Sequence, residues 1–321
     1  MHLLKPPRLN DGDTIGVIAP SYPVFPFQKA YDQGIANLKA FGFKVKEGKT
    51  VRLMYRGYMA GTGYQRAEDI NDMFADEEVK AIVCAIGGQV AINTLRYLDY
   101  DLIGANPKIF SGMSDITTFH AAFLAKTGLS GLHQSDVIFG FGADMESPEA
   151  KYEMDLFFKV TKYPKPLKLL PKFTKWETWR EGKCEGRLFG GNIPSLQTLL
   201  GTPYFPELKE KIVFFWECMT KPLDKIDQDL TQLREVGLFD RTAGMLIGKI
   251  RGEDQNQPDK LIDMSSEVKE VILEITEEYD FPIIGNVDFG HYTPNMPLPM
   301  WLKASLDTEG EKLSINESYV K

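Results

Sequence analysis

A serine, a glutamate and a histidine stand in this chain where they could together cleave an acyl bond. Ser114 lies in the run Gly-Met-Ser-Asp at 112–115, at a predicted junction between a strand and a helix. A serine at such a junction presents its hydroxyl beside the free N–H groups of a helix N-terminus, which can stabilise an oxyanion. The run is similar to a nucleophile elbow, although Ile116 replaces the second glycine of G-x-S-x-G. Spacing alone leaves open that Ser114 only caps the helix.

A serine nucleophile needs a base, and the chain holds four histidines. His291 directly follows a predicted apolar strand, so it lies in a loop that could reach across a cleft. His133 also falls in a loop that could line a site, whereas His120 is expected to point away from Ser114 on the following helix. His2 lies at the terminus. The sequence favours His291 as the base, with an ordinary surface histidine as the alternative.

Glu217 ends the apolar run 212–216, which is predicted to be a buried strand. A buried carboxylate is costly to desolvate unless it is paired, so a functional or paired role is favoured. The order Ser114, Glu217, His291 is the chain order of α/β-hydrolase triads. A cysteine nucleophile at Cys84 or Cys218 is a weaker alternative, because both positions are better explained as buried small residues.

The first 140 residues alternate between short apolar runs and segments with helical periodicity. Strands are predicted at 14–20, 43–45, 81–86 and 108–112, and helices at 27–41, 66–75, 91–99 and 116–125. This alternation predicts a doubly wound parallel sheet, in which ligands gather at the carboxyl ends of the strands. Gly87 and Gly88 end one of these strands, where backbone N–H groups could approach a ligand. A tight turn without a ligand is the alternative.

The remainder of the chain predicts a second domain of a different kind. We expect an α/β domain over 1–150, a linker close to the substrate over 151–186, and a mixed α+β domain over 187–321. Within the last of these, strands are predicted at 211–216, 244–250 and 282–287, helices at 226–236 and 266–279, and a terminal hairpin at 303–315. The fold class is therefore α/β followed by α+β.

Composition narrows the possible partners and the compartment. The 321 residues carry a net charge of −8, so the Lys/Arg face that neutralises phosphates is lacking, and binding to nucleic acid or membrane is not expected. No run approaches the roughly 20 apolar residues that span a bilayer, and no signal peptide is evident. Three widely spaced cysteines indicate free thiols in a reducing compartment, so a cytoplasmic protein is expected. No metal or cofactor is expected.

Taken together, several motifs resemble the LD-carboxypeptidase family of serine peptidases, the S66 family. The motifs are Ala60-Gly61-Thr62, Ile86-Gly87-Gly88, Asn106-Pro107-Lys108-Ile109-Phe110-Ser111-Gly112-Met113-Ser114-Asp115, Gly190-Gly191-Asn192, Glu217 and Asp288-Phe289-Gly290-His291. The resemblance implies a triad at the interface of the two domains. Ser114 would be the nucleophile, His291 the base and then the acid, and Glu217 the group that orients the imidazole. It implies amide hydrolysis through an acyl-enzyme on Ser114.

The resemblance also implies the groups around the triad. The oxyanion hole would consist of the backbone N–H groups of Gly88 and Asp115. Gln89, followed by Val90, departs from the residues common in relatives, which bears on substrate specificity. Substrate contacts are expected from Gln89, Asn192 and either Trp176 or Trp179. One of the two tryptophans would stack on a base, unless both only pack the segment between the domains.

The family has two branches with different substrates. One trims the terminal D-alanine from murein tetrapeptides at an L,D-bond, and the other resembles the microcin C immunity protein, which cleaves an amide in a peptidyl or aminoacyl nucleotide. The runs 98–110, 126–129 and 286–291 look closer to the second branch. The expected partner is thus a small peptide or peptidyl-nucleotide, and relatives suggest a homodimer. A non-catalytic ligand-binding relative is the alternative of another class.

Overall fold

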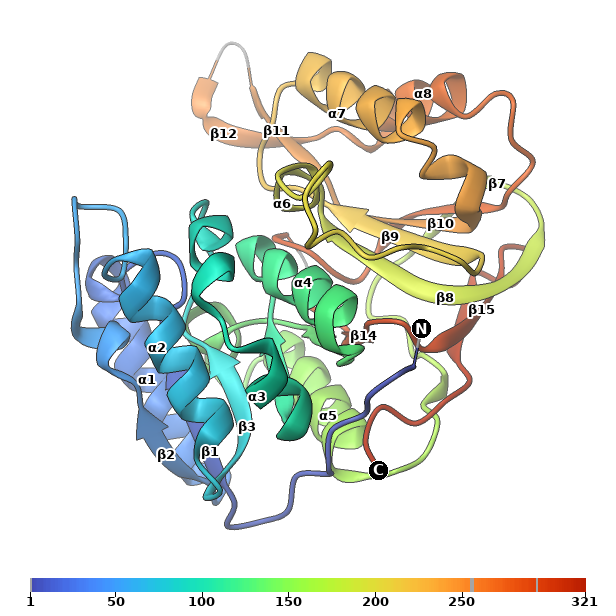
Figure 1. The fold of residues 1–321 in the computed structure, drawn as a ribbon. Helices are drawn as coiled ribbons and strands as arrows, with labels where there is room; N and C mark the ends of the chain where they lie inside the picture. Colours follow the sequence, from blue (N-terminus) through green and yellow to red (C-terminus); the bar gives the residue numbers. More distant parts are fainter. Residues whose placement is uncertain (1, 255–256, 293) are drawn as a thin grey trace.

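The strands of the N-terminal domain end toward the C-terminal domain, as a computed structural model of residues 2–254, 257–292 and 294–321 shows (Figure 1). In this described part of the chain, the first sheet has six strands in the order β14-β5-β4-β3-β1-β2. Neighbours from β2 to β5 are parallel, and β14 is antiparallel to β5. The strands are β1 (Thr14–Ile18), β2 (Lys44–Glu47), β3 (Val79–Cys84), β4 (Ile109–Gly112), β5 (Leu132–His133) and β14 (Leu298–Pro299).

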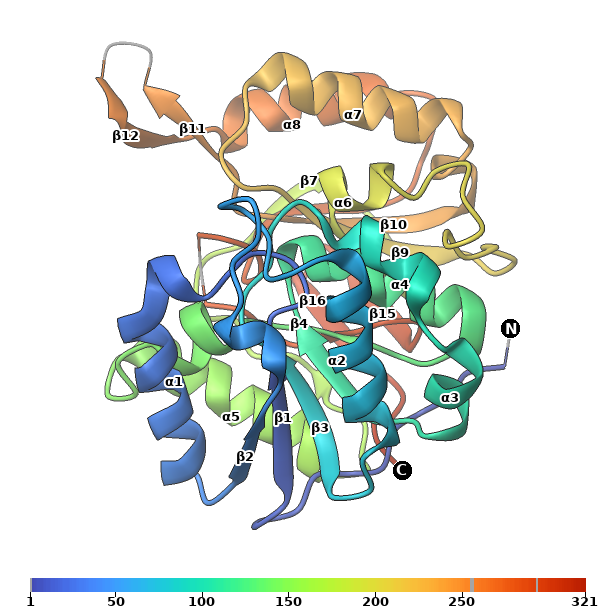
Figure 2. The same ribbon diagram turned by 60° about the vertical axis from the view of Figure 1, so that its left-hand side comes forward.

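Helices cover both faces of this sheet, which confirms the predicted doubly wound fold (Figures 1 and 2). One face packs against α1 (Gln28–Ala40) and α5 (Pro148–Lys162). The other face packs against α2 (Gly63–Ala75), α3 (Tyr100–Ala105) and α4 (Thr117–Thr127). Because both faces are covered, Ile82 and Val83 of β3 are fully buried although they point in opposite directions. The continuous apolar run of β3 follows from this two-sided burial.

The C-terminal domain is built on a mixed sheet, as predicted. Among the described residues this sheet has eight strands in the order β6-β16-β15-β8-β9-β10-β13-β7, of which the run β8 to β13 is parallel. The strands are β6 (Lys168–Leu169), β7 (Glu177–Arg180), β8 (Lys183–Asn192), β9 (Ile212–Glu217), β10 (Thr242–Gly248), β13 (Ile283–Val287), β15 (Lys303–Asp307) and β16 (Lys312–Ile315). Helices α6 (Ile193–Gln197), α7 (Leu223–Glu235) and α8 (Ser265–Ile275) pack on it. A hairpin, β11 (Arg251–Asp254) and β12 (Gln257–Asp263), projects from the domain (Figure 2).

The segment between the two domains is more structured than a linker. The boundary predicted at residue 150 falls inside α5, whose Phe157 packs edge-on against Phe141 of the N-terminal domain. The later part of the same segment supplies β6 and β7 to the C-terminal sheet. The predicted helix over 91–99 is a 3-10 helix, η3 (Ala91–Tyr97), and α3 follows it.

Two long-range pairings tie the domains together. β14 leaves the C-terminal part of the chain to pair with β5 of the N-terminal sheet. The chain ends also meet, because the N–H of Lys321 donates to the Pro6 carbonyl at 3.0 Å and the N–H of Arg8 donates to the Lys321 carbonyl at 3.1 Å. The N-terminal sheet is therefore completed by a strand from the C-terminal part of the chain.

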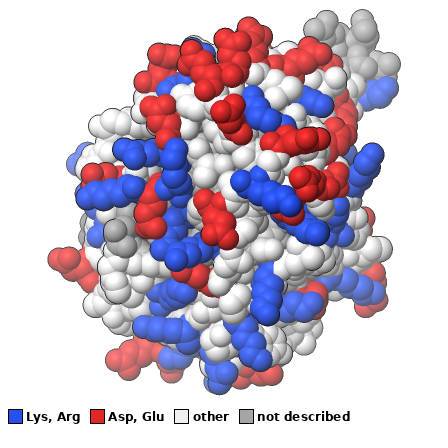
Figure 3. Space-filling model, turned by 90° about the vertical axis from the view of Figure 1, so that its right-hand side faces the viewer, with Lys and Arg blue, Asp and Glu red and all other residues white. Residues whose placement is uncertain are grey.

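The surface mixes both signs of charge. On the face shown in Figure 3, basic and acidic side chains are interspersed, and acidic ones gather at the upper edge over the C-terminal domain. Among the helices of the described residues, none has the length and apolar character needed to cross a bilayer.

Candidate active site

Ser114 occupies a strained turn between β4 and α4. Its φ is 60°, a left-handed conformation that costs a residue other than glycine about 1–3 kcal/mol. The cap of α4 is Ile116, which makes no side-chain capping bond, so the alternative that Ser114 merely caps this helix was wrong. The Ser114 hydroxyl makes no hydrogen bond with another described residue. The Ser114 hydroxyl therefore has no hydrogen bond in the described structure that would explain it as a stabilising group of the turn.

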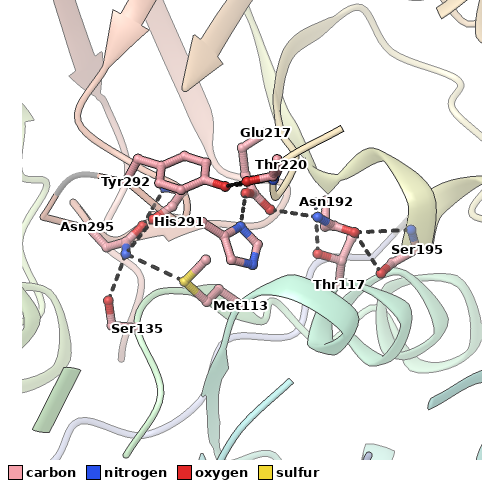
Figure 4. Close-up of polar contacts among 11 residues, drawn as sticks. Met113, Thr117, Ser135, Asn192, Ser195, Glu217, Thr220, His291, Tyr292 and Asn295 are labelled. Carbon is pink, nitrogen blue, oxygen red and sulfur yellow. Dashed lines mark hydrogen bonds and ion pairs between the residues drawn. The ribbon is translucent and has the colours of Figure 1, made fainter. Parts of the chain in front are cut away.

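Glu217, the last residue of β9, and His291, in the loop after β13, form a pair across the intervening strand β10 (Figure 4). The carboxylate of Glu217 is fully buried and contacts the imidazole at Nδ1 through Oε2. Its other oxygen, Oε1, accepts a hydrogen bond from Nδ2 of Asn192 at 3.0 Å. Burial alone would raise the pKa of Glu217, but the charge of His291 and these hydrogen bonds outweigh it and hold the pKa below its usual value. Within the described ranges, the hydrogen bond of the His291 ring is made through Nδ1, so Nε2 can face a third group.

The pKa of His291 is shifted in the opposite direction. Burial would lower the pKa of the imidazole, but the charge and hydrogen bond of Glu217, together with the charge of Asp136, raise it above 6.5. Two carboxylates, one from each domain, therefore favour the imidazolium. Such an arrangement stabilises the positive charge that a general base acquires when it takes a proton.

The loop of His291 is fastened to the N-terminal domain by Asn295 (Figure 4). Oδ1 of Asn295 accepts from the N–H of Gly290 at 2.6 Å, and its Nδ2 donates to the Gly290 carbonyl at 3.0 Å. The same Nδ2 donates to Oγ of Ser135 at 2.7 Å, and Nε2 of Gln134 donates to the Asn295 carbonyl at 2.9 Å. This contact brings the loop after β5 against the loop after β13.

Asp136, next to Ser135, is a site residue that the sequence analysis missed. It is almost fully buried, and it accepts from the N–H of Phe139 at 2.8 Å as the cap of η5 (Val137–Phe141). Burial raises the pKa of Asp136 to about 7, while backbone N–H groups, including that of Gly87, and the charge of His291 lower it. The only sequence signal was its place shortly after the predicted loop of His133.

A polar network holds the loop that was predicted to supply the oxyanion hole. Asp115 accepts through Oδ2 from the hydroxyl of Ser21 at 2.5 Å and from the N–H of Ala91 at 2.8 Å. Gly88 has a φ of 155°, and a Cβ there would collide with Ser21, so only glycine fits. Asp115 lies in the first turn of η4 (Ser114–Ile116), where backbone N–H groups have no partner within the helix.

The predicted substrate contacts differ in their surroundings. Gln89 is exposed beside Gly88, whereas Asn192 is buried and holds Glu217. Trp176 is fully buried and donates through Nε1 to Asp288 at 2.8 Å. Trp179 packs beneath Gly285, where an added Cβ would overlap its ring. Neither ring is exposed in this structure, and stacking of one of them on a base stays a prediction.

The remaining candidate nucleophiles and bases are buried in the core. His120 binds the Gly112 carbonyl through Nε2 at 2.9 Å, and burial lowers its pKa to about 3. His133 packs between Phe215 and Phe289, and burial lowers its pKa to about 4. Burial raises the pKa of the Cys84 and Cys218 thiols, so both stay protonated and unreactive.

Comparison with known proteins gives matches along most of the chain. Residues 15–134 match the model of the LD-carboxypeptidase N-terminal domain, and residues 185–306 match that of the C-terminal domain. A probable murein peptide carboxypeptidase of Bacillus subtilis is 33% identical over 98% of this chain and 95% of that protein. The microcin C7 self-immunity protein MccF of Escherichia coli is 28% identical over 99% of this chain and 97% of that protein.

Solved structures match the whole chain. The MccF-like protein of Bacillus anthracis superposes with a TM-score of 0.87 at 30% identity, covering 98% of this chain and 99% of that one. A structure of MccF in complex with aspartyl sulfamoyl adenosine also gives a TM-score of 0.87, at 26% identity, with 99% and 100% covered.

Proposed function

Because the chain belongs to the LD-carboxypeptidase family of serine peptidases, we propose that it hydrolyses an amide bond in a small peptide or in a peptidyl or aminoacyl nucleotide. The observations that carry this proposal are the contact between the buried carboxylate of Glu217 and Nδ1 of His291, and the strained turn that holds Ser114. A serine hydrolase needs a hydroxyl, a base and a carboxylate that orients the base.

The proposed mechanism assigns one task to each group. Nε2 of His291 takes the proton of Ser114 as Oγ attacks the carbonyl carbon, and the oxyanion is stabilised by the N–H groups of Gly88 and Asp115. The imidazolium then gives its proton to the leaving amine, so that an ester remains on Ser114. Water hydrolyses this ester by the same route. Glu217 stays ionised throughout and stabilises the imidazolium, consistent with its lowered pKa.

Two substrate classes are supported by different relatives. MccF, which is bound to aspartyl sulfamoyl adenosine in a solved structure, supports an aminoacyl nucleotide. The relative from Bacillus subtilis, which has the higher sequence identity, supports a murein peptide. The burial of Trp176 and Trp179 weakens one argument for the nucleotide, because neither ring is exposed in this structure. The murein peptide therefore stands as the second candidate substrate.

A parallel assay tests the proposal. The wild type and a Ser114→Ala variant are assayed on a murein tetrapeptide and on an aminoacyl sulfamoyl adenosine, with Ser305→Ala on β15 as the matched control. We expect the wild type and the control to cleave one of the substrates, and Ser114→Ala to lose several orders of magnitude in rate. Unchanged hydrolysis by Ser114→Ala would overturn the proposal. Labelling of Ser114 by a fluorophosphonate without cleavage of either substrate would retain the nucleophile and reject both substrate classes.

A further inference from the structure

Asn295 contacts both of the chain segments that carry the proposed nucleophile and base, although it is not one of the proposed triad (Figure 4). Its Nδ2 lies 3.5 Å from Sδ of Met113, the residue before Ser114. The same nitrogen donates to the carbonyl of Gly290, the residue before His291, at 3.0 Å. The side chain is only 4% exposed. One buried amide therefore joins the neighbour of Ser114 to the neighbour of His291.

The carboxamide of Asn295 forms two hydrogen bonds with the backbone of Gly290. Its Oδ1 accepts from the Gly290 N–H at 2.6 Å, while its Nδ2 donates to the Gly290 carbonyl. A carboxamide offers an acceptor and a donor group side by side, so this double contact restrains both the position and the orientation of Gly290. The N–H of Met296 also donates to the Asp288 carbonyl at 2.8 Å, which closes the same loop at its base. The loop is thus held by its own residues.

Gly290 packs directly against the side chain of Glu217. A Cβ on Gly290 would stand 3.0 Å from Cβ of Glu217 and 3.3 Å from its Oε2. That oxygen is the one that contacts the imidazole of His291. The φ of Gly290 is 105°, a conformation that residues with a side chain rarely adopt. Because Gly290 has no side chain, Asn295 can hold the backbone before His291 close to the carboxylate.

Asn295 is itself anchored to the N-terminal domain at two points. Its backbone N–H donates to Oε1 of Glu153 on α5 at 2.8 Å, and its Nδ2 donates to Oγ of Ser135 at 2.7 Å. Burial raises the pKa of Glu153 to about 7, and the hydrogen bonds from Asn295 and Ser135 oppose this rise. All three residues are buried. The N-terminal domain therefore determines where Asn295 lies.

We propose that Asn295 is a positioning residue, which holds His291 at the distance from Ser114 that proton transfer needs. The effect on catalysis rests on the proposed hydrolase function, whereas the restraint on His291 beside Glu217 does not. Ser114 belongs to the N-terminal domain and the other two groups to the C-terminal part of the chain, so no single element can set their spacing. A shift of about 1 Å between reacting groups is costly in rate, which gives such a residue a measurable effect.

Proton NMR of the full-length protein tests the restraint on His291 without any substrate. A proton held between an imidazole nitrogen and a carboxylate resonates at lower field than backbone amide protons. We expect Asn295→Ala to broaden or lose the signal of the proton on Nδ1 of His291, since both side-chain hydrogen bonds to Gly290 are removed. A signal as sharp in Asn295→Ala as in the wild type would overturn the proposal.

Two buried serines at opposite ends of the β5–β14 pairing give a matched comparison. Ser135→Ala removes the acceptor for Nδ2 of Asn295, whereas Ser130→Ala removes a hydrogen bond of 2.6 Å to the Met300 carbonyl. We expect Ser135→Ala to speed exchange of the Nδ1 proton of His291 with water by up to about tenfold, and Ser130→Ala to leave it nearly unchanged. This pair decides the question if Asn295→Ala fails to fold. Equal exchange in the two serine variants would overturn the proposal.

Kinetics separates positioning from substrate binding. On the substrate that the parallel assay identifies, Asn295→Ala should lower kcat by about 10²-fold and change KM by less than about threefold. A raised KM with unchanged kcat would overturn the positioning role. If neither substrate is cleaved and Ser114 resists a fluorophosphonate, the hydrolase proposal fails. The NMR comparison then still shows whether Asn295 holds His291 beside Glu217.

Discussion

Gly87 lies so close to Ser114 that a Cβ on Gly87 would stand 2.8 Å from the Cβ of Ser114 and 3.1 Å from its Oγ. Ser114 has a positive φ, so its position depends on the packing around it. The glycine at the end of β3 therefore sets the space in which the proposed nucleophile stands. This relation connects the β3–η3 loop to the turn after β4.

We expect Gly87→Ala to lower kcat/KM by roughly 10²-fold, because a misplacement of about 1 Å at the reacting atoms costs that much. The rate of fluorophosphonate labelling of Ser114 should fall in parallel. Gly104→Ala on α3 is the matched control, since its Cβ would meet Thr127 at an ordinary 3.6 Å. Wild-type labelling in Gly87→Ala would contradict the proposed dependence.

Glu217→Gln should reduce kcat by about 10³- to 10⁴-fold with a smaller effect on KM. The amide can no longer stabilise the imidazolium, and its NH₂ group can face Nδ1 of His291 and favour the wrong tautomer. Steady-state kinetics measures this loss, and Glu185→Gln, at an exposed position on β8, serves as the control. A loss of less than tenfold would reject Glu217 as the orienting carboxylate.

The pH dependence of kcat/KM should report the imidazole of His291. A general base acts when it is neutral, so activity should rise with pH, with a midpoint above 6.5 because the pKa of His291 is raised. The groups that face the imidazole are Glu217, Asp136 and His133. Asp136 itself titrates near 7, so its growing charge should broaden the rise.

Asp136→Asn tests this account of the pH profile. The amide oxygen can still accept from the N–H of Phe139, so η5 keeps its cap while the charge is removed. Loss of a negative charge lowers the pKa of His291, and the midpoint should move to lower pH by about half a unit to one unit. The rise should also become steeper. An unchanged midpoint would show that Asp136 has no electrostatic influence on His291.

Arg66→Met should destabilise the fold by about 2–4 kcal/mol. The fully buried guanidinium donates to the carbonyls of Pro20 at 2.8 Å and Val90 at 3.1 Å, and also to Asn93. Methionine cannot donate to the carbonyls of Pro20 and Val90, which lie in the loops after β1 and β3. Urea unfolding measures the change, and Arg96→Met on η3 provides a more exposed control. Equal stability of the two variants would exclude this role for Arg66.

The strands that the sequence predicted well are those buried on both faces. β3 and β9 appear as continuous apolar runs because helices or other layers cover both of their faces. β8, in contrast, is polar at its start and apolar only at its end. The exposed first half of β8 therefore lacks the apolar run that would have predicted a strand. β14 has two residues and exists only through its pairing with β5, a partner about half the chain away. No local pattern reports such a pairing.

The candidate site shows the same division between local and long-range information. The turn of Ser114 and the strand end of Glu217 have local signatures, and the structure brings Glu217 and His291 together as the chain order suggested. Asp136 had no such signature, because its position near His291 depends on Asn295 joining two loops from different domains. The burial of Trp176 likewise depends on Asp288, more than 100 residues away. Pairings of this kind come from tertiary packing.

The path of the chain after β13 limits how the two domains can move. The backbone leaves the C-terminal sheet, passes through His291, adds β14 to the N-terminal sheet, and returns to the C-terminal sheet as β15. His291 therefore lies in a connecting segment that begins at a strand of one domain and ends at a strand of the other. A hinge motion that parted the domains would separate His291 from Glu217 or break the pairing of β14 with β5. We therefore expect substrate to enter and leave by movement of side chains and short loops, with both domains held in place.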